Sequence, residues 1–293
     1  MLTEAEEELS RQRPNAIDFD RVSELHYLGN YVRKLPVNMA RMMENAYDWE
    51  HLPYVHASSF SSIELIASGA WGWRAKIGLP PASGNAYQLL DLRVARDENY
   101  WVSTVYDGPG AGIEIHTQAR AIADEEIEVD VRFYLPEAPA DASMSATALR
   151  YLSDQYATLY DEDTELMSGR QQALDERARG ATSVAEGETL RVGAVTELDR
   201  DIAHIIETGL GRFCVRYWDG VWIAHSATCP HLLGPLQDSS IDQAGRITCP
   251  WHGYRFDVRT GANLDGKCRA LSPAPQTFEK DGALYVRIES GLN

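Results

Sequence analysis

Two short loops in the last third of the chain constrain it most, because each carries one cysteine and one histidine. The first loop is Cys229-Pro230-His231 and the second is Cys249-Pro250-Trp251-His252. Two thiolates and two imidazoles could close a tetrahedral zinc site. Zinc fingers usually pair like residues at each end, whereas two mixed loops suit a [2Fe–2S] cluster in which histidines replace two of the cysteines. The pattern therefore predicts an iron–sulfur cluster held by Cys229, His231, Cys249 and His252.

The sequence around these loops closely resembles the Rieske family. The residues that carry the likeness are 220–222, 229–236, 249–257 and 260–261. Leu233 and Trp251 stand near the places where the cytochrome-complex members of the family have an extra cysteine. The segment is therefore more similar to the ferredoxin and oxygenase branch. We expect the other two cysteines, Cys214 and Cys268, to be structural thiols.

A second group of polar residues lies in a helical stretch over 37–55. Asn45, Asp48 and His51 follow one another at intervals of three residues, which a helix places on one face. His56 comes five residues after His51 and would point away on a regular helix, but Pro53 breaks the helix and could swing it back. Two histidines need one carboxylate to complete the facial triad of non-haem iron oxygenases.

The carboxylate is predicted from a long helix over 146–177. Apolar residues recur there at steps of three and four, and Asp163 fills one place in this stripe. A carboxylate on a core-facing stripe is costly unless it is paired or binds a metal. Asp163 is therefore a better candidate ligand than Asp161 and Glu162, which the same pattern predicts to be exposed.

These residues also resemble the catalytic domain of the Rieske-type ring-hydroxylating oxygenases, in which an asparagine, an aspartate and two histidines occur in this order and spacing. The resemblance implies a helix-grip fold, in which a curved antiparallel sheet wraps a long helix. It also implies a mononuclear Fe(II) bound by His51, His56 and Asp163. The domain order is reversed relative to that family, because here the catalytic part precedes the Rieske part.

The same resemblance implies an activity. With O2 and two electrons, the protein would hydroxylate or otherwise oxidise a small organic substrate, aromatic or cyclic. The electrons would come from a separate NAD(P)H-dependent reductase or a ferredoxin. Asp48 would join the two metal centres by hydrogen bonds to His51 and His252, and Asn45 would steer the iron site. The alternatives are an electron carrier whose first domain only binds a ligand, and a zinc-bound interaction module.

The predicted fold class is α+β. A helix-grip domain over 21–179 is followed by an all-β Rieske domain over 188–290, with a small polar linker over 180–187. The first domain should hold an antiparallel meander, and residues 1–20 should form a poorly fixed arm. Alternation of apolar residues predicts strands over 87–94, 100–106, 113–122 and 127–134, and 25–35 is a further strand-like run that Pro36 ends.

Charge and hydropathy narrow the possible partners. The chain of 293 residues has 27 Lys and Arg against 44 Asp and Glu, for a net charge of −17. Such a surface would repel nucleic acid and anionic membranes. No apolar run approaches the ~18 residues of a spanning helix, and the polar N-terminus is unlike a secretory signal. We therefore expect a cytoplasmic protein, which could form a homo-oligomer.

Overall fold

The computed structural model describes residues 2–84, 86–179, 189–208 and 210–288. The chain divides into two compact units, Met1–Ser168 and Gly169–Asn293. The predicted linker over 180–187 lies outside the described residues, and the domain bounds 21–179 and 188–290 stay predictions. In the part of the chain that the structure describes, no helix is both long and apolar enough to cross a membrane.

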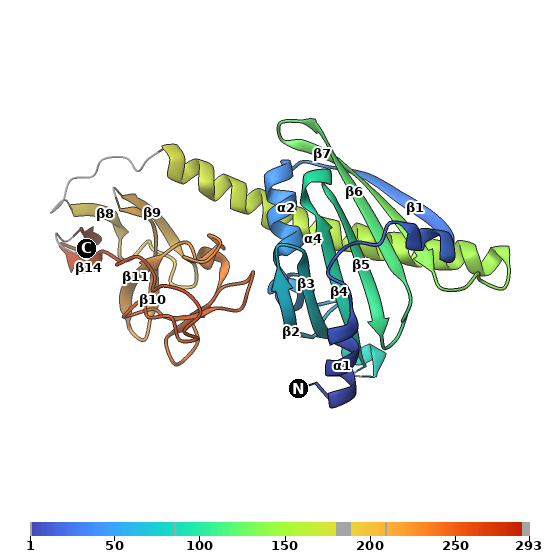
Figure 1. Cartoon of the computed structure of the whole chain (residues 1–293). Coiled ribbons are helices and arrows are strands. Elements are labelled where there is room, and N and C mark those ends of the chain that lie inside the picture. Colours follow the sequence, from blue (N-terminus) through green and yellow to red (C-terminus); the bar gives the residue numbers. More distant parts are fainter. Residues whose placement is uncertain (1, 85, 180–188, 209, 289–293) are drawn as a thin grey trace. The chain divides into compact units, whose positions relative to one another are not determined.

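The first unit is built on one seven-stranded antiparallel sheet, with the strand order β1-β7-β6-β5-β4-β3-β2 (Figure 1). Sequential hairpins build most of this order, which confirms the predicted meander, and β1 returns to pair with β7. The strands are β1 (His26–Leu35), β2 (Ser62–Gly69), β3 (Gly72–Gly78), β4 (Tyr87–Ala95), β5 (Tyr100–Asp107), β6 (Glu114–Ala123) and β7 (Glu126–Leu135). The helices are α1 (Glu4–Gln12), α2 (Met39–Tyr47), α3 (Leu52–Val55) and α4 (Ala142–Arg179), and the residues of α4 from Gly169 on belong to the second unit.

The long helix α4 covers one face of this sheet. Its first turn is capped by Asp141, whose carboxylate accepts a hydrogen bond from the Met144 amide at 2.8 Å. Along β7 the alternate side chains from Ile127 to Phe133 are fully buried, as period-two patterning predicts. Phe133 packs edge-on against Tyr156 of α4, with ring centroids 5.5 Å apart. The prediction of an N-terminal domain made of an antiparallel sheet and a long helix is thus confirmed.

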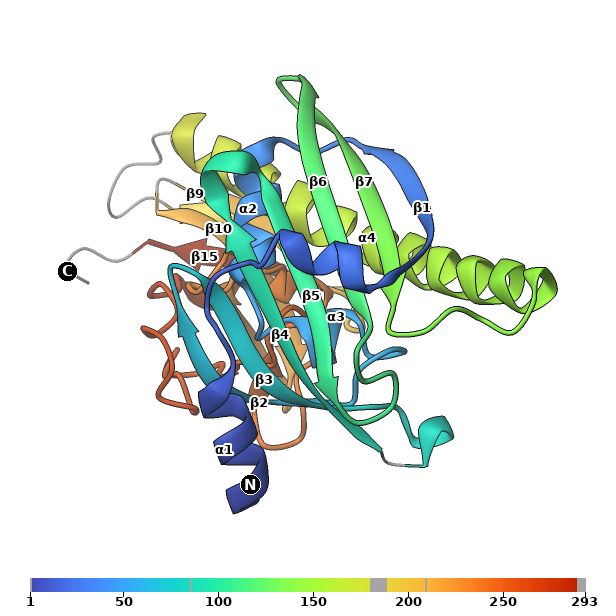
Figure 2. The ribbon, with the colours of Figure 1, turned by 45° about the vertical axis from the view of Figure 1, so that its right-hand side comes forward.

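The prediction of a poorly fixed N-terminal arm is wrong. A capping box between Thr3 and Glu6 starts α1, and the arm lies on the sheet face opposite α4 (Figure 2). Lys76 Nζ lies 2.9 Å from a Glu6 carboxylate oxygen, and the Arg74 guanidinium donates to the Ser10 carbonyl at 2.8 Å. The charges that suggested an unattached arm are paired with strand residues far along the chain, which local sequence patterns do not show.

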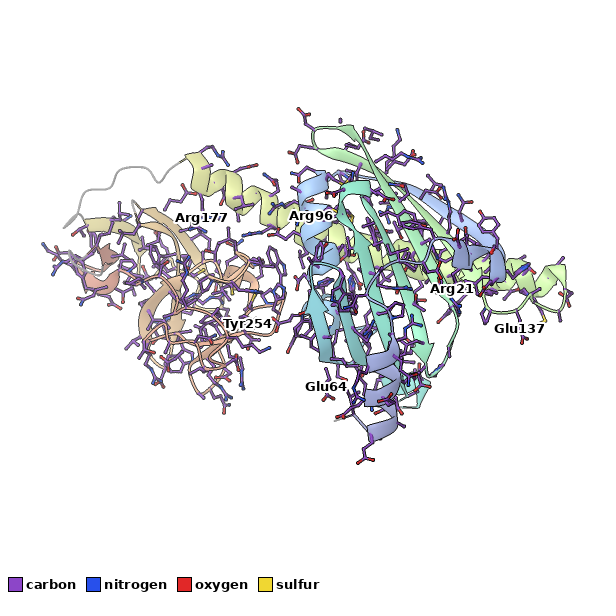
Figure 3. All side chains as sticks on the ribbon, in the orientation of Figure 1. Arg21, Glu64, Arg96, Glu137, Arg177 and Tyr254 are labelled. Atoms are coloured by element: carbon purple, nitrogen blue, oxygen red, sulfur yellow. The ribbon has the colours of Figure 1, made fainter. Side chains whose placement is uncertain are left out.

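Asp91 of β4 lies at the centre of this arm–sheet contact and is fully buried. Arg13 Nε and Arg93 Nε lie 3.0 and 3.1 Å from its oxygens, and Arg74 lies 3.6 Å away. Nearby, Arg21, labelled in Figure 3, donates to the buried Glu114 at 2.9 Å. The Asp91 carboxylate thus pairs with three guanidinium groups. Two of these groups belong to buried side chains, Arg74 and Arg93.

Replacing Asp91 by alanine should lower the free energy of unfolding of the first unit by about 3–5 kcal/mol, because it takes from the buried Arg74 its carboxylate partner and leaves the buried Arg93 only Glu114 among the described carboxylates, at 3.8 Å. Asp97→Ala, in an exposed position just beyond β4, should change it by less than about 0.5 kcal/mol. Hydrogen exchange of the β4 amides across a urea series measures both values. Equal values for the two variants would contradict the role given to Asp91.

The second unit is dominated by short strands. They form the sheets β11-β10-β9, β12-β13 and β14-β15-β8. A core of Val215, Trp222, Leu284 and Val286 joins the first and third of these. The strands are β8 (Thr189–Ala194), β9 (His204–Thr208), β10 (Gly211–Trp218), β11 (Val221–Ser226), β12 (Arg246–Thr248), β13 (Arg255–Asp257), β14 (Gln276–Lys280) and β15 (Ala283–Arg287).

Candidate metal centres

The two candidate histidines of the first unit, His51 and His56, lie at the two ends of one short helix, α3. The sequence pattern predicted that Asn45, Asp48 and His51 share one helix face. This prediction is wrong, because α2 ends at Tyr47 and the backbone of Asp48 is extended. His51 precedes α3 and His56 follows it. Pro53 does not break a helix either, because it occupies the first turn of α3, where its missing N–H would have no helical partner.

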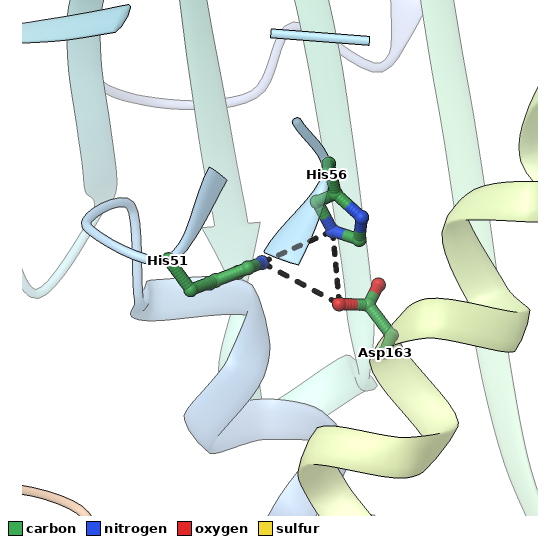
Figure 4. Close-up of side chains that lie close together, drawn as sticks. All are labelled: His51, His56 and Asp163. Atoms are coloured by element: carbon green, nitrogen blue, oxygen red, sulfur yellow. Dashed lines mark hydrogen bonds and ion pairs between the residues drawn. The ribbon is translucent and has the colours of Figure 1, made fainter. Parts of the chain in front are cut away.

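The structure brings His51, His56 and Asp163 together in one buried cluster (Figure 4). The two Nε2 atoms lie 3.2 Å apart, and Asp163 Oδ1 lies 3.4 Å from His51 Nε2 and 3.0 Å from His56 Nε2. Ligand atoms that each lie about 2.1 Å from one metal ion are themselves about 3.0–3.4 Å apart. The three side chains therefore fit a metal ion with two nitrogen ligands and one oxygen ligand.

Two further carboxylates stand behind the histidines. Glu162 Oε2 lies 2.7 Å from His56 Nδ1, and Asp48 Oδ2 lies 3.6 Å from His51 Nδ1. A carboxylate at Nδ1 holds a proton there and leaves Nε2 with a lone pair for a metal. The sequence predicted Glu162 to be exposed, yet its side chain is only 28% exposed. From the sequence alone, only the position of Glu162 next to Asp163 could have indicated its contact with His56.

The carboxylates around the histidines favour a positive charge at this place, either on a protonated imidazole or on a bound metal ion. Burial lowers the pKa of His51, but hydrogen bonds and charge from Asp163 and Asp48 outweigh it and raise the pKa to about 10. Burial raises the pKa of Asp163, yet His51 and His56 hold it below its usual range. The Asn45 side-chain oxygen is buried and has no hydrogen-bond partner among the described residues. Asn45 and the three clustered side chains line the same cavity.

The two cysteine–histidine loops of the second unit share one backbone plan. The Cys229 amide donates to the Gly234 carbonyl, and the Cys249 amide donates to the Tyr254 carbonyl, both at 2.8 Å. Each cysteine carbonyl in turn accepts from the amide four residues later, of Leu233 or Gly253. Leu233 and Gly253 both have a left-handed backbone, with φ of 65° and 67°. The loops thus present their cysteines in the same way.

The side chains of these loops converge. Cys229 and Cys249 are buried and free of disulfides, and the rings of His231 and His252 lie 4.6 Å apart at 84°. The two cysteines share a hydrogen bond that, with His252, lowers the pKa of Cys249 against the effect of burial and raises the pKa of Cys229, so one of the two sulfurs favours the thiolate. A thiolate is the form of cysteine that binds metals. Two sulfurs and two imidazoles therefore fit a cluster of mixed ligation.

The surroundings leave these sulfurs a confined space. A Cβ on Gly234 would lie 2.6 Å from Cys249 Sγ, so only glycine fits there. By contrast, burial raises the pKa of Cys214 to about 12, which keeps that residue a thiol. Cys268, outside both loops, is partly exposed. The contact predicted between Asp48 and His252 joins residues of different units and stays a prediction.

A known protein family matches most of the second unit. Residues 188–279 match the Rieske [2Fe-2S] domain family. Flavonoid 8-hydroxylase 2 of Ocimum basilicum is 38% identical over 87 residues, which are 29% of this chain and 15% of that protein. Pheophorbide a oxygenase of Oryza sativa subsp. japonica is 45% identical over 38 residues, 13% of this chain and 7% of that protein. The chain thus covers only a small part of these relatives.

Two solved structures align with part of this chain each. A START superfamily protein from Mycobacterium smegmatis aligns with 48% of this chain and 99% of its own, at 11% identity and a TM-score of 0.41. The ferredoxin of carbazole 1,9a-dioxygenase from Nocardioides aromaticivorans IC177 aligns with 33% of this chain and 95% of its own, at 25% identity and a TM-score of 0.31. From the family match and the paired loops, residues 188–279 are a Rieske [2Fe–2S] domain.

Proposed function

We propose that the protein is a Rieske non-haem iron oxygenase that oxidises a small organic substrate with O2 and two externally supplied electrons. The observation that carries this proposal is the convergence of His51, His56 and Asp163 in a chain that also has a Rieske domain. The relatives named above are a hydroxylase and an oxygenase, which supports the same reaction class.

The first unit would hold the mononuclear iron through His51, His56 and Asp163. Iron bound by two imidazoles and one carboxylate keeps open positions for O2 and substrate, and a Rieske cluster supplies electrons one at a time. Glu162 would fix the ring of His56 by accepting from its Nδ1–H, whereas Asp48, 3.6 Å from His51 Nδ1, would act on that ring through its charge.

In the second unit, Cys229, His231, Cys249 and His252 would hold the cluster. Electrons would come from a separate NAD(P)H-dependent reductase or a ferredoxin. We propose that Asp48 also reaches His252 and so forms a short polar path between the two metal centres. Asn45, buried beside Asp48, would steer the iron site.

Counting iron tests the proposal against an electron carrier. The oxygenase should contain about three iron atoms per chain, two in the cluster and one in the first unit, whereas a carrier should contain two. A zinc-bound module would be colourless. Substrate-dependent O2 consumption with a generic reductase then tests the reaction itself. Two iron atoms per chain after reconstitution with excess Fe(II), with no O2 consumed, would favour the carrier.

The reduced protein should show an electron paramagnetic resonance signal of the Rieske type, with a low average g. Cys249→Ser should abolish this signal, because the loop then loses the residue that binds iron as a thiolate. Cys214→Ser is the matched control, since Cys214 is an equally buried cysteine in strand β10 of the same unit and should leave the signal intact. An all-cysteine ferredoxin signal, or loss of the signal in the control alone, would contradict this assignment.

A further inference from the structure

The metal-binding cluster of the first unit lies in the wall of a small cavity of about 130 Å³. The other walls come from α2, the strands β3, β4 and β5, and α4, and they are mainly aliphatic and aromatic. Its aromatic lining residues are Phe60, Trp73, Trp101, Tyr156 and Tyr160. An apolar cavity next to a reactive centre binds its ligand by shape and by exclusion of water.

The volume limits the size of that ligand. A protein cavity of about 150 Å³ holds one benzene molecule, and sites for larger ligands run from about 300 Å³ upwards. A cavity of about 130 Å³ is therefore close in size to one that holds a single six-membered ring.

The charges limit its chemistry. Among the described residues that line the cavity there is no lysine or arginine, and Asp48 and Asp163 are its acidic members. Away from the metal-binding cluster, a carboxylate, sulfonate or phosphate on the ligand would meet no lysine or arginine and would face Asp48. An unpaired charge in an apolar site is strongly disfavoured, so the walls select an uncharged molecule.

We infer that this cavity takes an uncharged compound of one ring, and that Trp101 is the residue that sets the size limit. That the compound is a substrate rests on the proposed function. Trp73 is a poorer candidate for the limit, because its indole N–H donates to the Ala46 carbonyl at 3.0 Å and ties β3 to α2. Trp101, from the central strand β5, is 6% exposed and presents its side chain to the cavity without such a described anchor.

Fluorine NMR titrations of the iron-loaded protein under anaerobic conditions test this inference directly. The probes are monofluorinated benzene, benzoate and naphthalene. Fluorobenzene should bind, fluorobenzoate should bind at least about 100-fold more weakly, and fluoronaphthalene at least about tenfold more weakly. Native protein that binds fluorobenzoate or fluoronaphthalene as tightly as fluorobenzene would overturn the inference.

Two variants test the role of Trp101. Trp101→Ala and the milder Trp101→Leu should each strengthen the binding of fluoronaphthalene at least about tenfold. Trp71→Ala is the matched control, because Trp71 belongs to the same unit but does not line the cavity. If Trp101→Ala does not fold, Trp101→Leu decides. A folded variant that still excludes naphthalene removes Trp101 as the size limit.

Binding and turnover separate this inference from the proposed function. If fluorobenzene binds as expected but uncharged single-ring compounds cause no O2 consumption, the ligand class stands and the oxygenase proposal fails. If the protein oxidises naphthalene or benzoate in preference to such compounds, the oxygenase proposal stands and the inferred ligand class is wrong.

Discussion

Asp163→Ala is expected to reduce the iron content from about three atoms per chain to about two, and to slow oxygenation by more than about 100-fold. The residue offers its Oδ1 to both histidines, at 3.4 and 3.0 Å, and two imidazoles alone hold ferrous iron weakly. Loss of residues that merely support a ligand already costs ten- to 100-fold in metal affinity or activity. The Rieske signal should survive, because the cluster loops belong to the other unit.

Asp161→Ala provides the control for this change. Asp161 lies on the same helix but is 67% exposed and pairs with Arg33, so its loss should leave iron content and activity unchanged. Iron analysis and single-turnover O2 consumption measure both variants. If Asp163→Ala keeps its third iron while Asp161→Ala loses it, the ligand has been assigned to the wrong residue.

Asp48→Asn is expected to leave both metal centres occupied and yet to slow substrate-coupled re-oxidation of the reduced cluster by at least about 100-fold. An amide has nearly the shape of the carboxylate, but it lacks the charge and donates at one end. It therefore cannot accept in the same way from His51 and, as proposed, from His252. The measurement is to reduce the cluster chemically, add substrate and O2, and follow its absorbance through one turnover.

Glu162→Gln tests whether Asp48 carries electrons to the iron or only supports an iron-binding histidine. Glu162 stands behind His56 as Asp48 stands behind His51. This variant should bind iron about ten- to 100-fold more weakly, but it should re-oxidise at the native rate once iron is saturating. Fast re-oxidation in Asp48→Asn would show that Asp48 is no bridge and that electrons reach the iron site by another route.

Much of the framework follows from short-range patterns in the sequence. Alternation along 127–134 predicts a strand with one buried face, and β7 has that form. The apolar stripe of α4 singled out Asp163, which is 9% exposed and lies with the two histidines. Such patterns work because the periods of helices and strands decide which side chains face the core.

The parts that the sequence did not predict depend on contacts between distant segments. Glu162 meets His56 only because the single turn of α3 aims the Nδ1 of that ring at α4. The N-terminal arm is fixed because Asp91, Arg74 and Glu6 find partners many residues away. Sequence periodicity does not predict these pairs, because the register of the strands and the path of the loops decide which side chains meet.

The two cluster loops share a backbone but place their histidines differently, and this difference has a spectroscopic consequence. Their hydrogen bonds repeat, but the histidine is the second residue after Cys229 and the third after Cys249. The backbone repeat therefore does not extend to the imidazoles, whose planes are 84° apart. In the proposed cluster, the two ligand nitrogens should have unequal hyperfine couplings to the reduced iron, and isotope labelling of histidine would resolve them as two signals rather than one.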